Sequence, residues 1–216
     1  MINIALVYLG AYLIGALPFG VIIARMRGVD LLTFGSKNPG ASNVARALGP
    51  WLGLLVFFLD IAKGAVPAYV AMQILDDPRH GLGAGVAAVL GHTLSPFLRF
   101  RGGKGIATSL GVLVGVAPFV ALYGYGAFLV LFAISRIVSI SSLIGALVVL
   151  ISAVILREST EFFVVFVPLV VYVFIRHRSN IKRLMKGEEP KLDLKPFGKK
   201  DNAERKREDD DLSGNQ

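Results

Sequence analysis

Residues 137–156 read IVSISSLIGALVVLISAVIL, a run of apolar and small residues without a charged side chain. A helix of about 20 such residues spans the hydrocarbon core of a bilayer. Polar breaks divide the rest of the chain into six further apolar segments: 3–24, 51–75, 81–98, 105–117, 119–134 and 160–176. The sequence therefore predicts an all-α polytopic membrane protein with about seven transmembrane helices.

The composition excludes an ordinary soluble domain. Of 216 residues, 54% are hydrophobic and only 18% are charged, with a mean hydropathy of +0.64. The absence of cysteine excludes disulfides, thiolate metal sites and a cysteine nucleophile. The net charge of +8 lies mainly in loops and tail, which favours anionic headgroups or substrates over nucleic acid. We expect residues 1–190 to form the transmembrane domain and residues 191–216 a polar, disordered tail.

The number and direction of the spans depend on two features. Segment 105–117 is short and its end depends mainly on Pro118, so a count of five helices stays open. With seven helices, nearly all lysines and arginines fall on one side of the membrane, and only Arg79 and Arg157 fall on the other. The positive-inside rule then places the N-terminus outside and the C-terminus in the cytoplasm.

The first of three polar motifs, residues 35–46, reads GSKNPGASNVAR. Its glycines and proline predict a turn, and its serines and asparagines supply neutral hydrogen-bond donors. An arginine adds a planar guanidinium that matches phosphate oxygens. We interpret the motif as an anion-binding loop, with a plain polar connector as the alternative. The candidate residues are Ser36, Asn38, Gly40, Asn43 and Arg46.

The second motif, residues 91–110, ends an apolar segment in two arginines, three glycines and a lysine. Glycines let backbone N–H groups approach an oxyanion, and Lys104 stands at the start of a helix, where an anion is favoured. A comparison with the nucleotide-binding P-loop fails, because Leu98 and Gly105 stand where that motif needs Gly and Ser or Thr. The alternative is a positively charged membrane anchor.

The third motif, residues 176–189, follows the last apolar segment. If the helix continues through it, His177 and Asn180 lie three positions apart on one face. A basic membrane anchor is again the alternative. Anchoring alone needs only lysine and arginine, so the histidine and asparagine indicate a chemical role.

No pattern indicates a dedicated catalytic base. Histidines 80, 92 and 177 all lack the aspartate five positions later that defines the membrane-acyltransferase dyad. A Ser-His-Asp set also fails, because Asp30 is the one credible aspartate on that face. A phosphate monoester, with a second pKa near about 6, can itself accept a proton. We therefore expect substrate-assisted chemistry without a cofactor or a metal ion.

Together, the three motifs resemble those of the bacterial acyl-phosphate:glycerol-3-phosphate acyltransferases, over residues 1 to about 191. The resemblance implies acyl transfer from a fatty acyl phosphate to the sn-1 hydroxyl of glycerol 3-phosphate, which gives lysophosphatidic acid. It also implies a multi-pass protein of the bacterial cytoplasmic membrane with its active site on the cytoplasmic face. The phosphate acyltransferase that makes acyl phosphate would be a functional partner.

Residue by residue, the resemblance implies that Ser36 and Arg46 are needed for catalysis. Lys104, also counted as catalytic, would hold the phosphate of glycerol 3-phosphate. His177 and Asn180 match the family's active-site histidine and asparagine. Glu189 would support the structure, and Glu161 at the start of the last helix is counted with the third motif. The implied substrate-binding residues are Asn38, Gly40, Asn43, His92, Gly102, Gly103, Gly105 and Thr108.

A membrane transporter of an organic phosphate is the alternative function. A transporter would also need basic residues, but we expect its charges near the bilayer midplane on broken helices. Here most charges cluster at one face, and Asp60 and Lys63 are the exceptions. We interpret this pair as structural, because paired charges inside a bundle are the least costly way to keep either one there.

Overall fold

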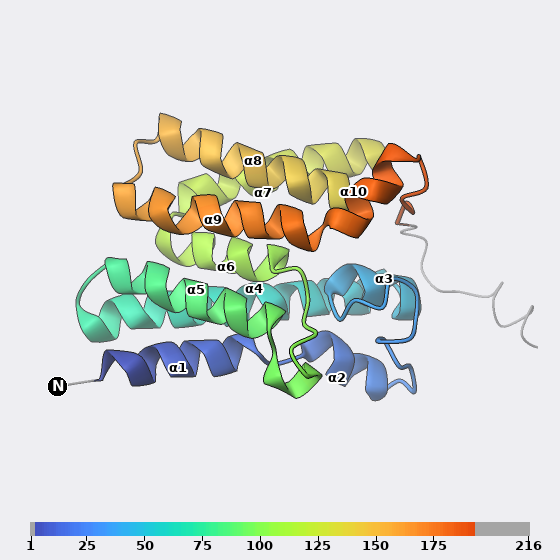
Figure 1. Ribbon diagram of the computed structural model, residues 1–216, viewed down its shortest axis with the longest axis horizontal. Helices are drawn as coiled ribbons and strands as arrows, with labels where there is room; N and C mark the ends of the chain where they lie inside the picture. Colours follow the sequence, from blue (N-terminus) through green and yellow to red (C-terminus); the bar gives the residue numbers. More distant parts are fainter. Residues whose placement is uncertain (1–2, 193–216) are drawn as a thin grey trace, which may run out of the picture.

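The computed structural model describes residues 3–192, and within that range every regular element is a helix (Figure 1). The elements are α1 (Ile4–Gly15), α2 (Phe19–Arg25), α3 (Ala41–Leu48), α4 (Pro50–Leu75), α5 (Arg79–Thr93), the 3-10 turn η1 (Pro96–Leu98), α6 (Ile106–Val116), α7 (Pro118–Ser135), α8 (Val138–Ile155), α9 (Thr160–Arg176) and α10 (Arg178–Met185). The all-α prediction is confirmed. Beyond Leu192, the tail predicted to be disordered lies outside the described residues.

The long helices run side by side in two groups that pack against each other (Figure 1). In the first group, α5 packs against α1 and α4, and α4 also packs against α6. In the second group, α8 packs against α7 and α9. One apolar core joins the groups, and it includes Val112 of α6, Val149 of α8 and Phe166 of α9.

Five helical segments are long and apolar enough to cross a membrane: Ile4–Arg25, Pro50–Leu75, Arg79–Leu98, Pro118–Ser135 and Val138–Ile155. A sixth qualifies if α9 and α10 are counted together across a bend of 58°. Helix α6 is apolar but has only 11 residues, so it is about 16 Å long. Large apolar side chains such as Leu122, Val130 and Ile155 are exposed on the outer faces, as in a lipid-facing surface. Seven spans and the direction of the termini stay predictions.

The helix limits show where local sequence signals hold and where they fail. The break predicted at Pro118 is confirmed: α6 ends at Val116, and α7 begins at Pro118, one residue before the predicted start. The first span predicted for residues 3–24 corresponds to the candidate span Ile4–Arg25, but its helix is interrupted between α1 and α2. Pro18 lacks the backbone N–H that would continue the helical hydrogen bonds of α1. The freed carbonyl of Ala16 accepts from Ser95 Oγ at 2.7 Å, and that of Leu17 accepts from Lys63 Nζ at 2.9 Å.

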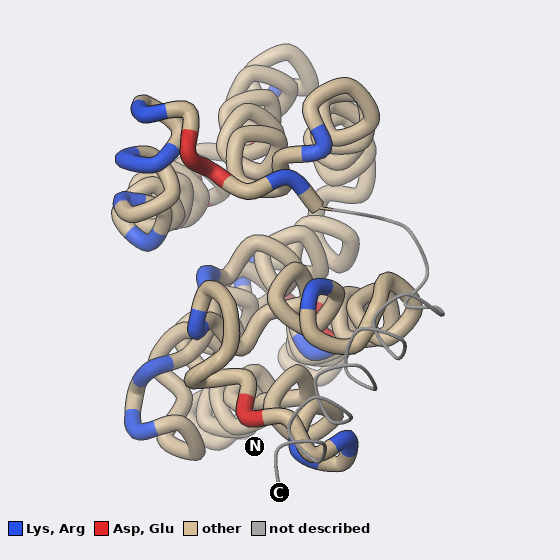
Figure 2. Tube along the Cα trace, turned by 90° about the vertical axis from the view of Figure 1, so that its right-hand side faces the viewer, with Lys and Arg blue, Asp and Glu red and all other residues tan. Residues whose placement is uncertain are grey.

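Two short helices, α3 and α10, lie at one end of the bundle (Figure 1). Helix α3 begins inside the first motif, so residues 41–46 are helical rather than part of a loop. Helix α10 follows a break at His177, so the helix does not continue through the third motif, which was the condition for placing His177 and Asn180 on one helix face. Figure 2 views the molecule from this end, where lysines and arginines are spread over the loops and short helices.

Candidate active site

The second motif folds back against the end of α5. After η1 the chain turns so that Gly102 N donates to Thr93 O and Gly103 N donates to His92 O, both at 3.1 Å. A side chain at Gly102 would collide with the His92 carbonyl, and one at Gly103 would collide with the His92 ring. The glycines are thus needed for close packing. Their N–H groups are occupied and not free for an anion, contrary to the sequence-based interpretation.

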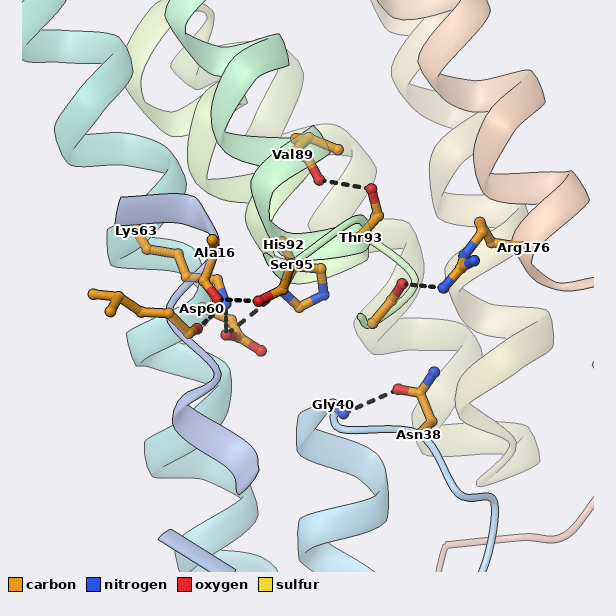
Figure 3. A network of polar contacts seen from close by, with 12 residues as sticks. Ala16, Asn38, Gly40, Asp60, Lys63, Val89, His92, Thr93, Ser95 and Arg176 are labelled. Carbon is orange, nitrogen blue, oxygen red and sulfur yellow. Dashed lines mark hydrogen bonds and ion pairs between the residues drawn. The ribbon is translucent and has the colours of Figure 1, made fainter. Parts of the chain in front are cut away.

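The same loop is held from its other side by the last residue of α9. Arg176 Nη2 donates to the carbonyl oxygens of Gly102 and Gly103, at 2.9 Å each. Figure 3 shows the Arg176 side chain pointing toward this part of the structure. The two glycine residues are therefore bonded to α5 through their N–H groups and to α9 through their C=O groups. This clamp fixes the loop immediately before Lys104.

Lys104 joins the second motif to the third. Its Nζ donates to Asn180 Oδ1 at 2.6 Å, and the Asn180 amide donates to Glu189 Oε1. Arg183 Nε donates to Glu189 Oε2 at 2.7 Å. Asn180 and Glu189 are buried, while Lys104 and Arg183 are partly exposed. The result is one alternating chain of cation, amide, carboxylate and cation.

Burial and neighbouring charges shift the pKa values in this chain. Burial lowers the pKa of Lys104 to about 8; Glu189 opposes the shift, and Arg183, Arg46 and Arg176 add to it. For Glu189, burial would raise the pKa, but hydrogen bonds from Asn180 and Arg183 hold it below its usual value. Glu189 is therefore ionised at neutral pH, and Lys104 is protonated but close to its titration range.

His177 is the junction between α9 and α10. Only 3% of its side chain is exposed, and Nδ1 lies 2.8 Å from the carbonyl oxygen of Val173. Because a carbonyl oxygen only accepts, Nδ1 carries the proton and Nε2 remains available for another partner. The break at His177 turns α10, and both His177 at the junction and Asn180 in α10 are buried.

The first motif is organised from inside by Asn43. This residue is fully buried, and its amide nitrogen donates to Leu31 O at 3.2 Å and Phe34 O at 3.0 Å, while its oxygen accepts from Ser36 N at 3.1 Å. Asn38 Oδ1 accepts from Gly40 N at 2.9 Å (Figure 3). Asn43 and Gly40 therefore shape the loop, while the side chain of Ser36 is exposed.

Arg46 brings the first motif to the same place. Its Nη2 lies 3.4 Å from the carbonyl oxygen of Pro190, next to Glu189. Its Nε is buried and has no hydrogen-bond partner among the described residues. Burial lowers the pKa of Arg46, and Glu189 opposes that shift. All three motifs thus meet around Glu189, with one donor of Arg46 unused.

An apolar cavity of about 80 Å³ begins beside this polar cluster, between α4, α6, α7, α8 and α9. The first turns of α6 contribute Ile106 and Ser109, directly after the loop that carries Lys104. The remaining walls are mostly apolar, and they include Phe57, Tyr125 and Phe128. Thr108, expected to bind substrate, is instead buried against Gly64 of α4. Its hydroxyl has no partner among the described residues.

The structure brings together most, but not all, of the residues singled out in the sequence. Lys104, Asn180, Glu189 and Arg46 converge, whereas His92 lies behind the loop. Glu161 lies in the first turn of α9, about 24 Å along that helix from the site. The sequence did not predict that Arg176 binds the carbonyl groups of Gly102 and Gly103. Arginines are common where a helix leaves the membrane, and nothing in the sequence distinguishes one that binds a distant loop.

Comparisons with known proteins show the family to which the chain belongs. A relative from Synechococcus elongatus, named glycerol-3-phosphate acyltransferase, is 41% identical over 201 residues that cover 89% of this chain and 96% of the relative. A relative of the same name from Aquifex aeolicus is 41% identical over 180 residues, which cover 83% and 94% of the two chains.

Two solved structures of PlsY (YgiH), an integral membrane glycerol 3-phosphate acyltransferase, match the fold at 38% sequence identity. The glycerol 3-phosphate form has a TM-score of 0.84 and the lysophosphatidic acid form 0.82; each match covers 88% of this chain and 96% of the other. The family model for glycerol-3-phosphate acyltransferase matches residues 5–187. This multi-pass membrane protein therefore belongs to the glycerol-3-phosphate acyltransferase family.

Proposed function

We propose that the protein transfers a fatty acyl group from acyl phosphate to the sn-1 hydroxyl of glycerol 3-phosphate and releases lysophosphatidic acid and phosphate. The contact between Lys104 and Asn180 carries the proposal, because it joins two motifs into one cationic site beside an apolar cavity. The matched structures, a glycerol 3-phosphate form and a lysophosphatidic acid form, support a substrate and a product of these two classes.

The phosphate of glycerol 3-phosphate is placed between Lys104 and Arg46. Lys104 donates one hydrogen bond to Asn180 and keeps two further N–H groups, and Arg46 has its unused Nε. Helix α6 starts after Gly105, whose φ of +88° suits glycine, and its first N–H groups add a favourable dipole. Ser36 and Asn38, on the loop before α3, supply neutral donors.

The acyl donor brings a second phosphate and a long apolar chain. The cavity that starts at Ile106 and Ser109 is suited to part of that chain, because its walls are mostly apolar and it lies next to the cationic cluster. A lipid-soluble donor can reach such a cavity from the bilayer, while glycerol 3-phosphate arrives from water at the charged end. The two substrates would meet near the start of α6.

The transfer needs little from the protein besides charge and orientation. The sn-1 oxygen attacks the acyl carbon, the bond from that carbon to the phosphate oxygen breaks, and the hydroxyl proton passes to a phosphate oxygen. Lys104 and Arg46 stabilise the negative charge that develops on the leaving phosphate and the acyl oxygen. His177 and Asn180 are held in orientation by Val173 and Glu189, so they can position the reacting groups without acting as a dedicated base.

The direct test supplies purified protein with acyl phosphate and labelled glycerol 3-phosphate and measures labelled lysophosphatidate. Parallel reactions with acyl-CoA and acyl carrier protein thioesters test the choice of donor. Product from acyl phosphate alone supports the proposal, and product from a thioester alone overturns the donor assignment. Uptake of glycerol 3-phosphate into proteoliposomes without acylation would instead favour the transporter.

The proposed location is a bacterial cytoplasmic membrane, with the site on the cytoplasmic face and the N-terminus outside. Because the chain has no cysteine, single cysteines report topology directly. Arg27→Cys lies at the end that carries the site, and Glu158→Cys lies between α8 and α9 at the other end. In intact cells, we expect an impermeant maleimide to label only Glu158→Cys. Labelling of Arg27→Cys alone would reverse the proposed orientation.

A further inference from the structure

A second polar cluster lies inside the bundle, behind the candidate site (Figure 3). It consists of Asp60 and Lys63 of α4 and His92 of α5, which are only 3%, 4% and 8% exposed. Lys63 Nζ lies 2.6 Å from Asp60 Oδ1, and His92 Nδ1 lies 3.8 Å from the same oxygen. The cavity at this cluster measures only about 10 Å³, so the cluster does not bind a substrate directly.

The cluster holds the break between α1 and α2. Inside a membrane, a broken helix leaves carbonyl groups that must find donors within the protein. Lys63 supplies the donor for Leu17 O, and Ser95, just beyond α5, supplies the donor for Ala16 O. Gly20, in the first turn of α2, packs so closely on the carbonyl of Pro39 that a side chain there would collide with it. The break therefore supports the loop of the first motif.

The same cluster also supports the loop of the second motif. The carbonyl of His92 accepts the hydrogen bond from Gly103 N, and the His92 ring lies where a side chain at Gly103 would be. On the far side of this ring lies the Asp60 carboxylate. The His92 ring thus lies between the buried ion pair and Gly103, the residue before Lys104.

Stability alone does not account for charges at this place. Buried ion pairs carry a large desolvation cost, and replacing both partners by apolar residues of similar size is often neutral or stabilising. Pro39 and Gly103, from the loops of the first and second motifs, line the same small cavity as the cluster, so a role for its charges in the geometry of these two loops is consistent with the contacts.

We infer that Asp60, Lys63 and His92 are positioning residues that set the distance from Lys104 to Asn180 and to the bound phosphate. His92 acts through Gly103, and the ion pair acts through His92 and through the α1–α2 break. The inference rests on the proposed function, because its main readout is the use of glycerol 3-phosphate. It assigns His92 a role behind the site rather than direct contact with substrate.

The principal test compares two histidines at opposite ends of α5. In His92→Leu, we expect the KM for glycerol 3-phosphate to rise about 10- to 100-fold, as for a misplacement of about 1 Å, with a smaller change in kcat. The KM for acyl phosphate should stay close to wild type. The matched control is His80→Leu, since His80 pairs with Tyr8 at the other end of the helix. Its kinetics should be unchanged.

A second test alters the contact itself. Gly103→Ala adds a methyl group that collides with the His92 ring, so it should also raise this KM. Combining it with His92→Ala removes the obstacle, and the double variant should bind glycerol 3-phosphate better than Gly103→Ala alone. Such coupling is expected only where the two residues act through one contact. Direct binding of glycerol 3-phosphate, measured without acyl donor, provides a readout independent of turnover.

A third variant, Asp60→Leu with Lys63→Met, should raise the same KM, and it should also unfold at a lower temperature in detergent because Leu17 O loses its donor. Wild-type KM in all these variants, or a fall in kcat with KM unchanged, would overturn the inference. If His92→Leu does not fold, the comparison of Gly103→Ala with the double variant Gly103→Ala, His92→Ala still tests the inference. Wild-type protein is assayed alongside the variants. If the wild type makes no lysophosphatidate, the proposed function fails. If the wild type is active, the KM values of the variants test this inference separately from the proposed function.

Discussion

Lys104 Nζ donates a hydrogen bond of 2.6 Å to Asn180 Oδ1, across 76 positions of sequence. The contact links the loop before α6 to the first turn of α10, two segments that approach only because α9 breaks at His177. Asn180 in turn separates the Lys104 cation from the Glu189 carboxylate. Lys104 is therefore held in place without a direct ion pair to any residue between positions 3 and 192, which leaves its charge for an anionic substrate.

Asn180→Leu should lower both stability and turnover. It removes the partner of Lys104 and one partner of Glu189, at a cost of about 1–3 kcal/mol for each buried group left unsatisfied. We expect kcat/KM to fall about 100-fold, as for removal of one preorganised donor. Thermal unfolding and steady-state kinetics measure the two effects. The control Ser179→Ala changes an exposed neighbour on the same helix, and an equal loss there would contradict a specific role for Asn180.

The use of glycerol 3-phosphate should decline at alkaline pH. Burial lowers the pKa of Lys104 to about 8, and the protonated form binds phosphate, so affinity is present below that pH and is lost as the pH rises through it. Above pH 8, kcat/KM for glycerol 3-phosphate should fall roughly tenfold per pH unit. Lys104→Arg keeps its charge, and its profile should be flat to about pH 10. An identical decline in both proteins would show that another group titrates.

Arg176→Lys should loosen the loop that precedes Lys104. Nη2 at the end of the guanidinium donates to two carbonyl oxygens at 2.9 Å each, and the shorter lysine side chain ends before that position, so it cannot reach both. We expect the KM for glycerol 3-phosphate to rise about tenfold while the protein stays folded. The control is Arg178→Lys, at an exposed position two residues later. Unchanged kinetics in Arg176→Lys would mean that α5 alone holds the loop.

Shortening the chain from its C-terminal end should leave the protein active until Glu189 is removed. Ending after Lys195 keeps Glu189 and also Leu192, whose N–H donates to Arg136 O at 2.8 Å, so activity should match the full chain. Ending after Glu188 removes Glu189 and leaves Arg183 and Asn180 without their partner. That protein should lose at least about 100-fold in kcat/KM. Loss of activity already at Lys195 would show that the tail contributes to the site.

The sequence motifs predicted many residues of the site, but they did not predict which hydrogen bonds each residue makes. Asn43 was expected to bind substrate, yet its amide braces the loop through Leu31, Phe34 and Ser36. Gly102 and Gly103 were expected to offer N–H groups to phosphate, yet α5 takes both. In each case the residue types of the motif indicated hydrogen bonding. The partner of each hydrogen bond depended on which segment packs against the motif.

The sequence by itself determined the helical membrane fold and the end of the bundle where basic residues gather. Run length, proline and charge act locally, so they can be read without knowing what packs against what. Only the tertiary structure decided which donors reach the carbonyls at the Pro18 break, how α10 bends away at His177, and that Asp60, Lys63 and His92 are buried beneath Gly103. These features depend on donors and acceptors far apart in the chain, since a carbonyl freed inside a membrane takes whichever donor the fold brings to it.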